Sequence, residues 1–265
     1  MPLDKFALYE LCAQNPARDA KLLRAIHADG CPKPRQDLTL GEDFCATAAL
    51  SRAWCDLSLR HRAVAVDHDR DVLARAPHHD RVTLTRSDVL NARAKADLIA
   101  VQNFSICELH NRATLVKYLR RARSRLNKHG SFICDIYGGS DAFFTGTITQ
   151  RIKPPPTCPR GTKISYSWEQ RSTDPLNGRV VNAMHFTLTL PGKKPIVTRD
   201  AFIYDWRLWS VPELRDAMTE AGFKRTLVYP RTADALDALG FMHVLPIDDP
   251  AETGDSFNVY VVGRG

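Results

Sequence analysis

The sequence predicts a doubly wound α/β fold, in which helices cover both faces of a mostly parallel sheet and an antiparallel β insertion is added. Five short apolar runs in the first half are separated by helical or loop segments, which is the pattern of βα units. The second of these runs ends in an acidic residue, Asp67. Beyond residue 160 apolar and polar residues alternate between turn signals, which is typical of antiparallel strands.

Composition limits the class of protein. The 265 residues, 44% of them hydrophobic, suffice for one sizeable core with an insertion. No stretch approaches the roughly 18 apolar residues that span a bilayer, and the start, MPLDKFALYE, carries an acid where a secretory signal carries basic charge. We therefore expect a cytoplasmic protein without membrane contact. The seven cysteines form no zinc pattern, so we expect reduced thiols and no metal.

The elements can be predicted in order from residue 4. Residues 4–29 show two apolar groups separated by Asn15-Pro16, which predicts two helices joined at a corner within an N-terminal part, 1–35. Leucines and alanines at helical spacing, with Gly130 just beyond them, predict a further helix over 112–127. The predicted parallel strands are 37–40, 62–67, 81–85, 97–102 and 130–136.

The second half begins with a break in this regularity. The proline-rich segment 153–159 predicts a loop, and about three antiparallel strands follow it within an insertion, 151–209. A capping box at Ser210 begins the next helix, and two apolar runs suit a closing hairpin. The core is thus expected to comprise 36–150 and 210–265. The three insertion strands are predicted at 163–171, 179–190 and 196–206, the hairpin at 223–229 and 257–262, and a short helix at 232–239.

The first strand and its turn indicate a ligand site. In doubly wound sheets, ligands bind in the crevice at the carboxyl ends of the strands, and Asp67 stands where an acid accepts hydrogen bonds from ribose hydroxyls. The first turn lacks G-x-G-x-x-G and has Ala46 and Ala48 where glycines would let backbone approach a pyrophosphate. Together with Glu42 and Asp43, this favours an adenosine cofactor without phosphates over a nicotinamide dinucleotide.

The segment Glu42–Ala48, reading EDFCATA, resembles the E-D-F-(S/C)-G-T-A first motif of a bacterial group of class I S-adenosylmethionine-dependent methyltransferases, with one departure at Ala46. The similarity covers nearly the whole chain, from Leu8 to Phe223. It implies a Rossmann-like core with a seven-stranded sheet. It continues through AVDHD (65–69), SDV (87–89), AVQNFS (100–105), DIYGG (135–139), WEQ (168–170) and DWRLW (205–209).

The resemblance also implies a cofactor, S-adenosyl-L-methionine, and the residues that bind it. Asp67 would bind the ribose, Asp88 and Val89 the adenine, and Glu42 the methionine part. Asp88 would alternatively serve only as a helix N-cap, and the Cβ of Ala46 would crowd the cofactor. The full predicted set is Tyr9, Glu42, Asp43, Phe44, Cys45, Ala46, Asp67, His68, Asp88, Val89, Asn103 and Phe104.

Methyl transfer from a sulfonium is an in-line displacement, so the enzyme mainly aligns the nucleophile and excludes water. Asn103 would face the transferred methyl group, or would merely satisfy a turn. Tyr137 is the first candidate for a base because strand ends face the crevice, and Glu169 and His185 are further candidates.

Aromatic residues in the insertion suggest where the substrate binds. Trp168, Trp206 and Trp209 would form an aromatic wall around a small acceptor, or would pack a small sheet. Arg207 would bind a substrate carboxylate or cover the rings. With the N-terminal helices, the insertion would form a lid.

We therefore expect methyl transfer to nitrogen, oxygen or carbon of a small-molecule acceptor. A first alternative is an RNA or protein methyltransferase, because the net charge is +7 and residues 117–128 are strongly basic; a solvated helix face explains that cluster equally well. The others are a cofactor-binding protein without turnover and a nicotinamide oxidoreductase. Nucleic acid is not the expected partner, since no RNA-binding module is visible, and the sequence does not indicate the oligomeric state.

Overall fold

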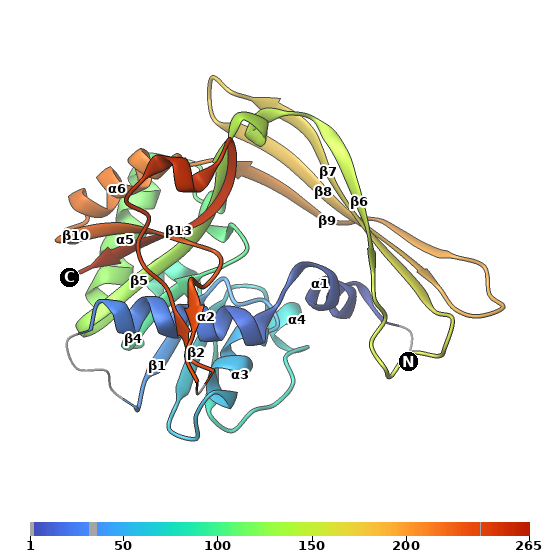
Figure 1. The fold of residues 1–265 in the computed structure, drawn as a ribbon, viewed down its shortest axis with the longest axis horizontal. Coiled ribbons are helices and arrows are strands. Elements are labelled where there is room, and N and C mark those ends of the chain that lie inside the picture. The colour runs from blue at the N-terminus through green and yellow to red at the C-terminus, as the bar shows by residue number, and fades with distance from the viewer. Residues whose placement is uncertain (1–2, 32–35, 239) are drawn as a thin grey trace. The chain divides into compact units, whose positions relative to one another are not determined.

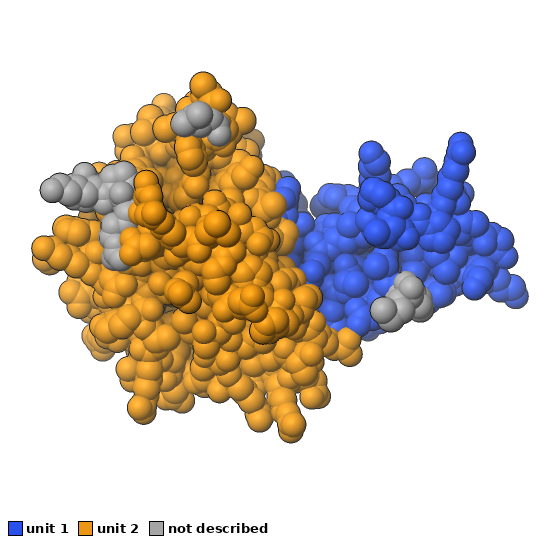
Figure 2. All heavy atoms as spheres, turned by 90° about the horizontal axis from the view of Figure 1, so that it is seen from below, with its two compact units in different colours: residues 1–15, 141–208 blue, residues 16–140, 209–265 orange. Residues whose placement is uncertain are grey.

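A computed structural model describes residues 3–31, 36–238 and 240–265. The chain divides into two compact units, shown in different colours in Figure 2. Unit 1 comprises residues 1–15 and 141–208, and unit 2 comprises residues 16–140 and 209–265.

These units differ from the predicted division, because the chain passes from unit 1 to unit 2 between Asn15 and Pro16. The first helix, Lys5–Ala13 (α1), buries Leu8 among insertion residues. The second, Pro16–Asp29 (α2), buries its leucines in the core of unit 2. The chain divides at Pro16, where the predicted break between the two helices is confirmed, and each helix packs its apolar face against the core of its own unit.

Unit 2 is built on a seven-stranded, mostly parallel sheet, as predicted (Figure 1). Its strand order is β10-β13-β5-β4-β1-β2-β3; β13 runs antiparallel to both of its neighbours, β10 and β5, and the other neighbouring strands are parallel. The strands are β1 (Thr39–Asp43), β2 (Arg62–Asp67), β3 (Val82–Arg86), β4 (Ala96–Val101), β5 (Leu126–Gly139), β10 (Arg225–Pro230) and β13 (Ser256–Arg264).

Helices cover both faces of this sheet (Figure 1). On one face, α2 and α3 contribute Leu22, Ile26 and Trp54 to a core that includes inward residues of the central strands. On the other, Phe132 of β5 contacts Tyr118 of α5 and Phe223, which follows α6. These elements are α3 (Ala49–Asp56), the short α4 (Arg70–Leu73), α5 (Arg112–Arg125) and α6 (Val211–Glu220), and α6 begins at the predicted Ser210 capping box.

A buried ion pair joins the carboxyl end of β1 to α5. Asp43 is fully buried, and Nη1 of Arg125 donates to its two carboxylate oxygens at 3.0 and 2.8 Å. The Tyr118 hydroxyl donates to the same carboxylate at 2.7 Å. A Cβ at Gly41 would lie 3.2 Å from Cγ1 of Ile99 and 3.3 Å from Cβ of Ala96, so glycine suits the close packing of β1 against β4. The basic cluster at 117–128 is therefore not wholly a solvated face, because Arg125 is 1% exposed.

The closing hairpin of β10 and β13 is confirmed, but the helix predicted at 232–239 is wrong. Ala235–Leu236 (β11) pairs instead with Met242–His243 (β12). The Asp237 carboxylate accepts the Phe241 N–H at 2.8 Å, and this local hydrogen bond favours a turn over a helix.

Unit 1 contains a four-stranded antiparallel sheet in the order β6-β7-β8-β9. The three strands predicted from alternation are confirmed, and β6 is a strand that the sequence did not reveal. Its sequence GTITQRI is almost wholly exposed, so it lacks the apolar run on which the prediction depended. The strands are β6 (Gly146–Ile152), β7 (Lys163–Asp174), β8 (Arg179–Thr189) and β9 (Ile196–Arg207).

None of the seven cysteines forms a disulfide in the described part of the chain. Within the described ranges, no helix combines the length and apolar character that a membrane span requires.

Replacing Arg125 tests the importance of the buried ion pair. We expect Arg125→Ala to lower the free energy of unfolding by about 3–5 kcal/mol, because it leaves the Asp43 carboxylate buried without its counterion. Lys117→Ala removes the same charge from an exposed position of the same helix and should change stability by about 0.5 kcal/mol or less. Urea unfolding of both variants measures the difference, and equal effects would contradict the structural role of the pair.

Candidate active site

The predicted cofactor residues of unit 2 follow the carboxyl ends of parallel strands, so the sheet brings them to one edge. Phe44 to Ala46 follow β1, Asp67 ends β2 and Asp88 follows β3. Asn103 and Phe104 follow β4, which pairs with β1 on one side and β5 on the other. The sheet topology therefore gathers these loops at the edge where the sequence predicted ligand binding.

The loop after β1 has an unusual backbone. Phe44, Ala46 and Ala48 have φ values of 59°, 46° and 56°, in the left-handed region that glycine adopts most readily. The Cys45 N–H donates to the Val66 carbonyl at 3.0 Å, which anchors the loop to β2. The turn therefore has a backbone typical of glycine, although its residues carry side chains. One of these residues is Ala46, where the similar methyltransferase motif has glycine.

Asp67 organises this loop. Its Oδ2 accepts the Ala46 N–H at 2.9 Å, and its Oδ1 accepts the Asp69 N–H at 2.9 Å. Its side chain is 13% exposed, whereas the neighbouring His68 side chain is 80% exposed. The residue expected to bind a ribose is thus in direct contact with the first-motif loop, although the two are 21 positions apart.

Glu42 lies beneath the same loop and is almost completely buried. Its Oε2 accepts the Ser51 N–H at 2.9 Å and the Ser51 hydroxyl at 2.6 Å, which ties β1 to the first turn of α3. Burial raises the pKa of Glu42 from 4.5 to about 7, although the two Ser51 hydrogen bonds and Arg52 act to lower it. This carboxyl group therefore changes protonation near neutral pH.

Two predicted residues are buried in the core beneath the edge. The Asp43 carboxylate is held by Arg125 and Tyr118, so its side chain has a structural role and only its backbone belongs to the loop. The Cys45 thiol is 4% exposed, and burial raises its pKa. β1 extends to Asp43, three residues beyond its predicted end at Leu40, and Cys45 packs in a core cluster with Ala65 and Leu73.

Asp88 serves as a helix N-cap, which is one of the two roles that the sequence predicted for it. Its Oδ1 accepts the Leu90 N–H at 2.8 Å at the start of a short 3₁₀ helix, Val89–Asn91. Val89 is 6% exposed. Capping uses one carboxylate oxygen and fixes the backbone here, which is compatible with the adenine contact that the resemblance implies.

A buried acid that the sequence did not reveal shapes the loop after β4. Asp135 on β5 accepts the Asn103 N–H at 3.1 Å and the Phe104 N–H at 2.8 Å. Both loop residues are left-handed, with φ of 57° and 63°. Nη1 of Arg231, which follows β10, lies 2.7 Å from Oδ2 of Asp135, and Nη2 lies 3.6 Å from Asp19 on α2.

Burial raises the pKa of Asp135 from 3.8 to about 6, against the lowering effect of Arg231 and the two N–H donors. The only sequence signal for Asp135 was its place at the end of an apolar strand, within the quoted DIYGG segment. Arg231 gave no signal, because its partner lies 96 positions away.

The two predicted catalytic residues lie near each other. Phe104 and Tyr137 form an edge-to-face ring pair with centroids 5.0 Å apart, and Asn103 precedes Phe104. Tyr137 is half-buried near the end of β5. Asn103 follows β4 and Tyr137 lies near the end of the neighbouring strand β5, so both remain candidate catalytic residues.

The predicted substrate residues divide between the units. Trp168, Trp206 and Arg207 belong to the sheet of unit 1, where Trp206 packs 5.8 Å from Trp168, and Tyr9 contacts Phe202 at 5.2 Å between ring centroids. Trp209 does not belong to this sheet, which corrects the prediction. It lies in unit 2, where it is 2% exposed and donates from Nε1 to the Leu109 carbonyl at 3.1 Å.

The other two candidate bases form a polar cluster on unit 1. His185 Nε2 lies 2.9 Å from Glu169, and the Asp200 N–H donates to His185 Nδ1 at 2.9 Å. Arg171 pairs with both Glu169 and Asp200. Because the Asp200 N–H fixes Nδ1 as an acceptor, Nε2 carries the proton and donates to Glu169, so these groups already satisfy one another.

The strand order with an antiparallel β13 is the fold of class I S-adenosylmethionine-dependent methyltransferases. No protein-family model and no curated protein matches the chain. Among solved structures, DesVI of Streptomyces venezuelae is similar with a TM-score of 0.70 at 16% identity, covering 96% of this chain and 94% of that one.

Two other similar structures are of proteins named for a methyltransferase activity. CalS10, an amino pentose methyltransferase from Micromonospora echinaspora, has a TM-score of 0.68 at 12% identity, covering 98% of this chain and 96% of that one. KedS8, a sugar N-methyltransferase from Streptoalloteichus sp ATCC 53650, has a TM-score of 0.65 at 13% identity, covering 97% and 91%. At these identities the similarity establishes the fold.

The pKa of Glu42 predicts a pH effect on stability. The folded protein binds this proton more tightly than the unfolded chain, so the contribution of Glu42 to stability is lost as pH rises from about 4.5 toward 7. Glu42→Gln removes that loss. We expect the stability of the variant relative to wild type to increase by about 2–3 kcal/mol between about pH 5 and pH 8 in urea unfolding.

The exposed Glu220 provides the matched control, since Glu220→Gln should leave the pH dependence close to that of wild type. A Glu42→Gln curve parallel to wild type would show that the carboxyl group does not change protonation in this range.

The strained turn predicts an unusual effect of glycine. Ala46→Gly should raise the free energy of unfolding by up to about 1 kcal/mol, because glycine adopts a φ of 46° without a Cβ clash. Ala53→Gly, in the interior of α3, should lower it by about 1 kcal/mol. Thermal unfolding compares the two, and a similar loss in both variants would argue against strain at Ala46.

Proposed function

We propose that this protein transfers a methyl group from S-adenosyl-L-methionine to a small-molecule acceptor. The proposal depends on one observation above all: the Asp67 carboxylate and the loop after β1 are directly hydrogen-bonded at the carboxyl edge of a class I methyltransferase sheet. That edge is where an open α/β sheet binds its ligand, and an acid at the end of β2 suits the two hydroxyls of a ribose.

The chemistry of the loop supports an adenosyl cofactor over a dinucleotide. A pyrophosphate requires close backbone approach and a favourable electrostatic environment. Here the left-handed positions 44, 46 and 48 carry side chains, and the loop follows two buried carboxyl residues, Glu42 and Asp43. Arg125 compensates the charge of Asp43, so the ionised form of Glu42 is the charge that opposes phosphate and suits the cationic amino group of a methionine moiety.

Within this proposal each residue has a limited task. Asp67 would bind the ribose, Val89 would pack against the adenine beside Asp88, and Glu42 with the backbone of 43–46 would receive the amino-acid part. S-adenosylmethionine supplies an electrophilic methyl group when bound. Asp135 holds the Asn103–Phe104 backbone in one conformation, so that Asn103 would align the nucleophile and Tyr137 would accept a proton where the acceptor carries one.

Nitrogen is the acceptor atom that we would test first. The names of CalS10 and KedS8 describe an amino pentose methyltransferase and a sugar N-methyltransferase, and both cover nearly the whole chain. In unit 1, the stacked and half-buried rings of Trp168 and Tyr204 offer aromatic faces suited to a small cationic or partly apolar acceptor. Oxygen and carbon acceptors would form the second set of candidates.

Calorimetric titration tests the cofactor assignment. We expect micromolar binding of S-adenosylmethionine and S-adenosylhomocysteine and no binding of NAD. Asp67→Ala should weaken both adenosyl ligands by about tenfold to a hundredfold, because it removes a charged hydrogen-bond acceptor.

Asp71→Ala is the control, because it removes an equal charge from an exposed position four residues along the chain. Binding of NAD alone, or of no ligand, would refute the proposed function. Adenosyl binding without product from any small amine, alcohol or carbon acid would instead favour a cofactor-binding protein without turnover.

A further inference from the structure

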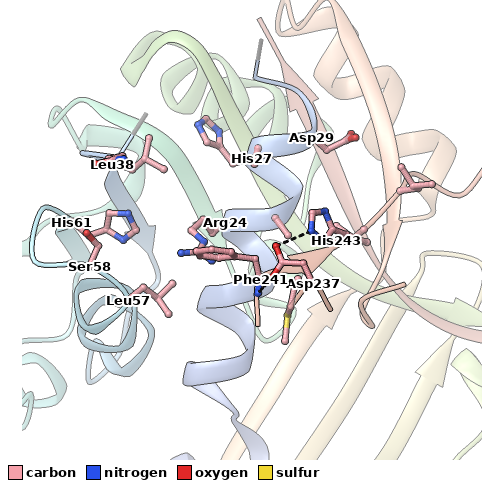
Figure 3. Close-up of a pocket in the computed structure, with 16 residues that line it drawn as sticks. Arg24, His27, Asp29, Leu38, Leu57, Ser58, His61, Asp237, Phe241 and His243 are labelled. Atoms are coloured by element: carbon pink, nitrogen blue, oxygen red, sulfur yellow. Dashed lines mark hydrogen bonds and ion pairs between the residues drawn. The ribbon is translucent and has the colours of Figure 1, made fainter. Parts of the chain in front are cut away.

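Unit 2 contains a cavity of about 770 Å³ at the amino ends of β1 and β2, the edge of the sheet opposite to the candidate active site (Figure 3). Leu38 and His61, which immediately precede those strands, line one side. The last turns of α2 and the β11–β12 hairpin line the other. A volume of this size suits a small organic ligand.

Arg24 of α2 is the main cationic group of the cavity. Its guanidinium stacks 4.4 Å from the Phe241 ring centroid, and burial lowers its pKa. Among the described residues, no carboxylate lies within ion-pair distance of Arg24. Asp237 acts on the pKa of Arg24 by its charge, which raises that pKa. The Asp237 oxygens accept the Phe241 N–H and lie 3.3 Å from His243 Nε2. A partly desolvated guanidinium without a direct anionic partner gains energy from one.

His61 offers a hydrogen-bond acceptor on the facing side of the cavity in Figure 3. Its ring stacks on Trp54 at 4.7 Å, and Nδ1 lies 3.2 Å from the Trp54 carbonyl. A carbonyl only accepts, so Nδ1 carries the proton and Nε2 has a free lone pair. Burial lowers the pKa of His61, with further lowering by Arg24 and Arg81, so the ring is neutral at pH 7.

The remaining walls are largely apolar. Leu57, Met242 and Val244 contribute hydrocarbon surface between the two polar sides. Asp29 also lines the cavity, but its carboxylate receives the Tyr229 hydroxyl at 2.5 Å and faces Arg264 at 3.8 Å. Its charge is therefore compensated, and the Arg24 side of the cavity remains the favourable place for a negative group.

We propose that this cavity binds a small, flat, apolar molecule with one anionic group, such as an aromatic carboxylate that also carries a hydroxyl. The anion would pair with Arg24, the flat body would lie between the aliphatic walls beside Phe241, and the hydroxyl would donate to Nε2 of His61. This site is separate from the cofactor edge, and it does not depend on the proposed function.

Three probes test the chemistry: 2-naphthoate, 6-hydroxy-2-naphthoate and the neutral 2-naphthalenemethanol, each titrated calorimetrically into the full chain. We expect the hydroxylated acid to bind more tightly than the plain acid, and the neutral alcohol most weakly. Arg24→Gln should weaken both acids by about tenfold or more, because it removes a charged hydrogen-bond donor. Lys21→Gln removes the same charge from an exposed position of α2 and should leave affinity unchanged.

Ala28→Trp localises the binding independently. Ala28 is exposed and lines the cavity, so a large ring there should block entry without altering the core. Saturating S-adenosylhomocysteine should not displace the probes. Failure of both acids to bind wild type, equal binding by Arg24→Gln or Ala28→Trp, or displacement by S-adenosylhomocysteine would overturn the proposed site. Equal affinity of the two acids would overturn the hydrogen bond to His61.

Discussion

The buried pair of Asp43 and Arg125 is the constraint on which the edge with the candidate active site depends. Two charges removed from water must be matched closely, and here the Tyr118 hydroxyl adds a third contact to the same carboxylate. The pair fixes the end of β1 against α5 at the residue before the first-motif loop begins. Because a one-residue slip of a strand exchanges its two faces, this contact also determines that Glu42 faces α3.

Carboxylates organise the loops at this edge in a common way. Asp67 holds the loop after β1, and Asp135 holds the loop after β4, each by accepting backbone N–H groups of residues in left-handed conformations. Such backbone is costly for residues other than glycine and persists only where surrounding contacts fix it. The acids thus stabilise left-handed backbone at Ala46 and Asn103, and they make the loop conformations a property of side chains on neighbouring strands.

Protonation links these contacts to solution conditions. Burial raises the pKa of Glu42 to about 7 and that of Asp135 to about 6, so both carboxyl groups lie close to a change of charge near neutrality. Glu42 lies on β1 and Asp135 on β5, each near the carboxyl end of its strand. A cationic group bound beside Glu42 would favour its ionised form, which connects the electrostatics of the resting protein with the ligand class that we propose.

The sequence by itself determined the class of fold, because hydrophobic periodicity and turn residues are local signals: it identified the parallel strands, α5, the break between α1 and α2 and the closing hairpin. It also placed Asp67 at a strand end. Tertiary structure alone decided that Asp43 and Arg125 are partners, that Arg231 reaches Asp135, and that Trp209 is a core residue, since these contacts join positions 82, 96 and 100 residues apart. Strand β6 escaped prediction because its exposed residues gain their regularity only from pairing with β7.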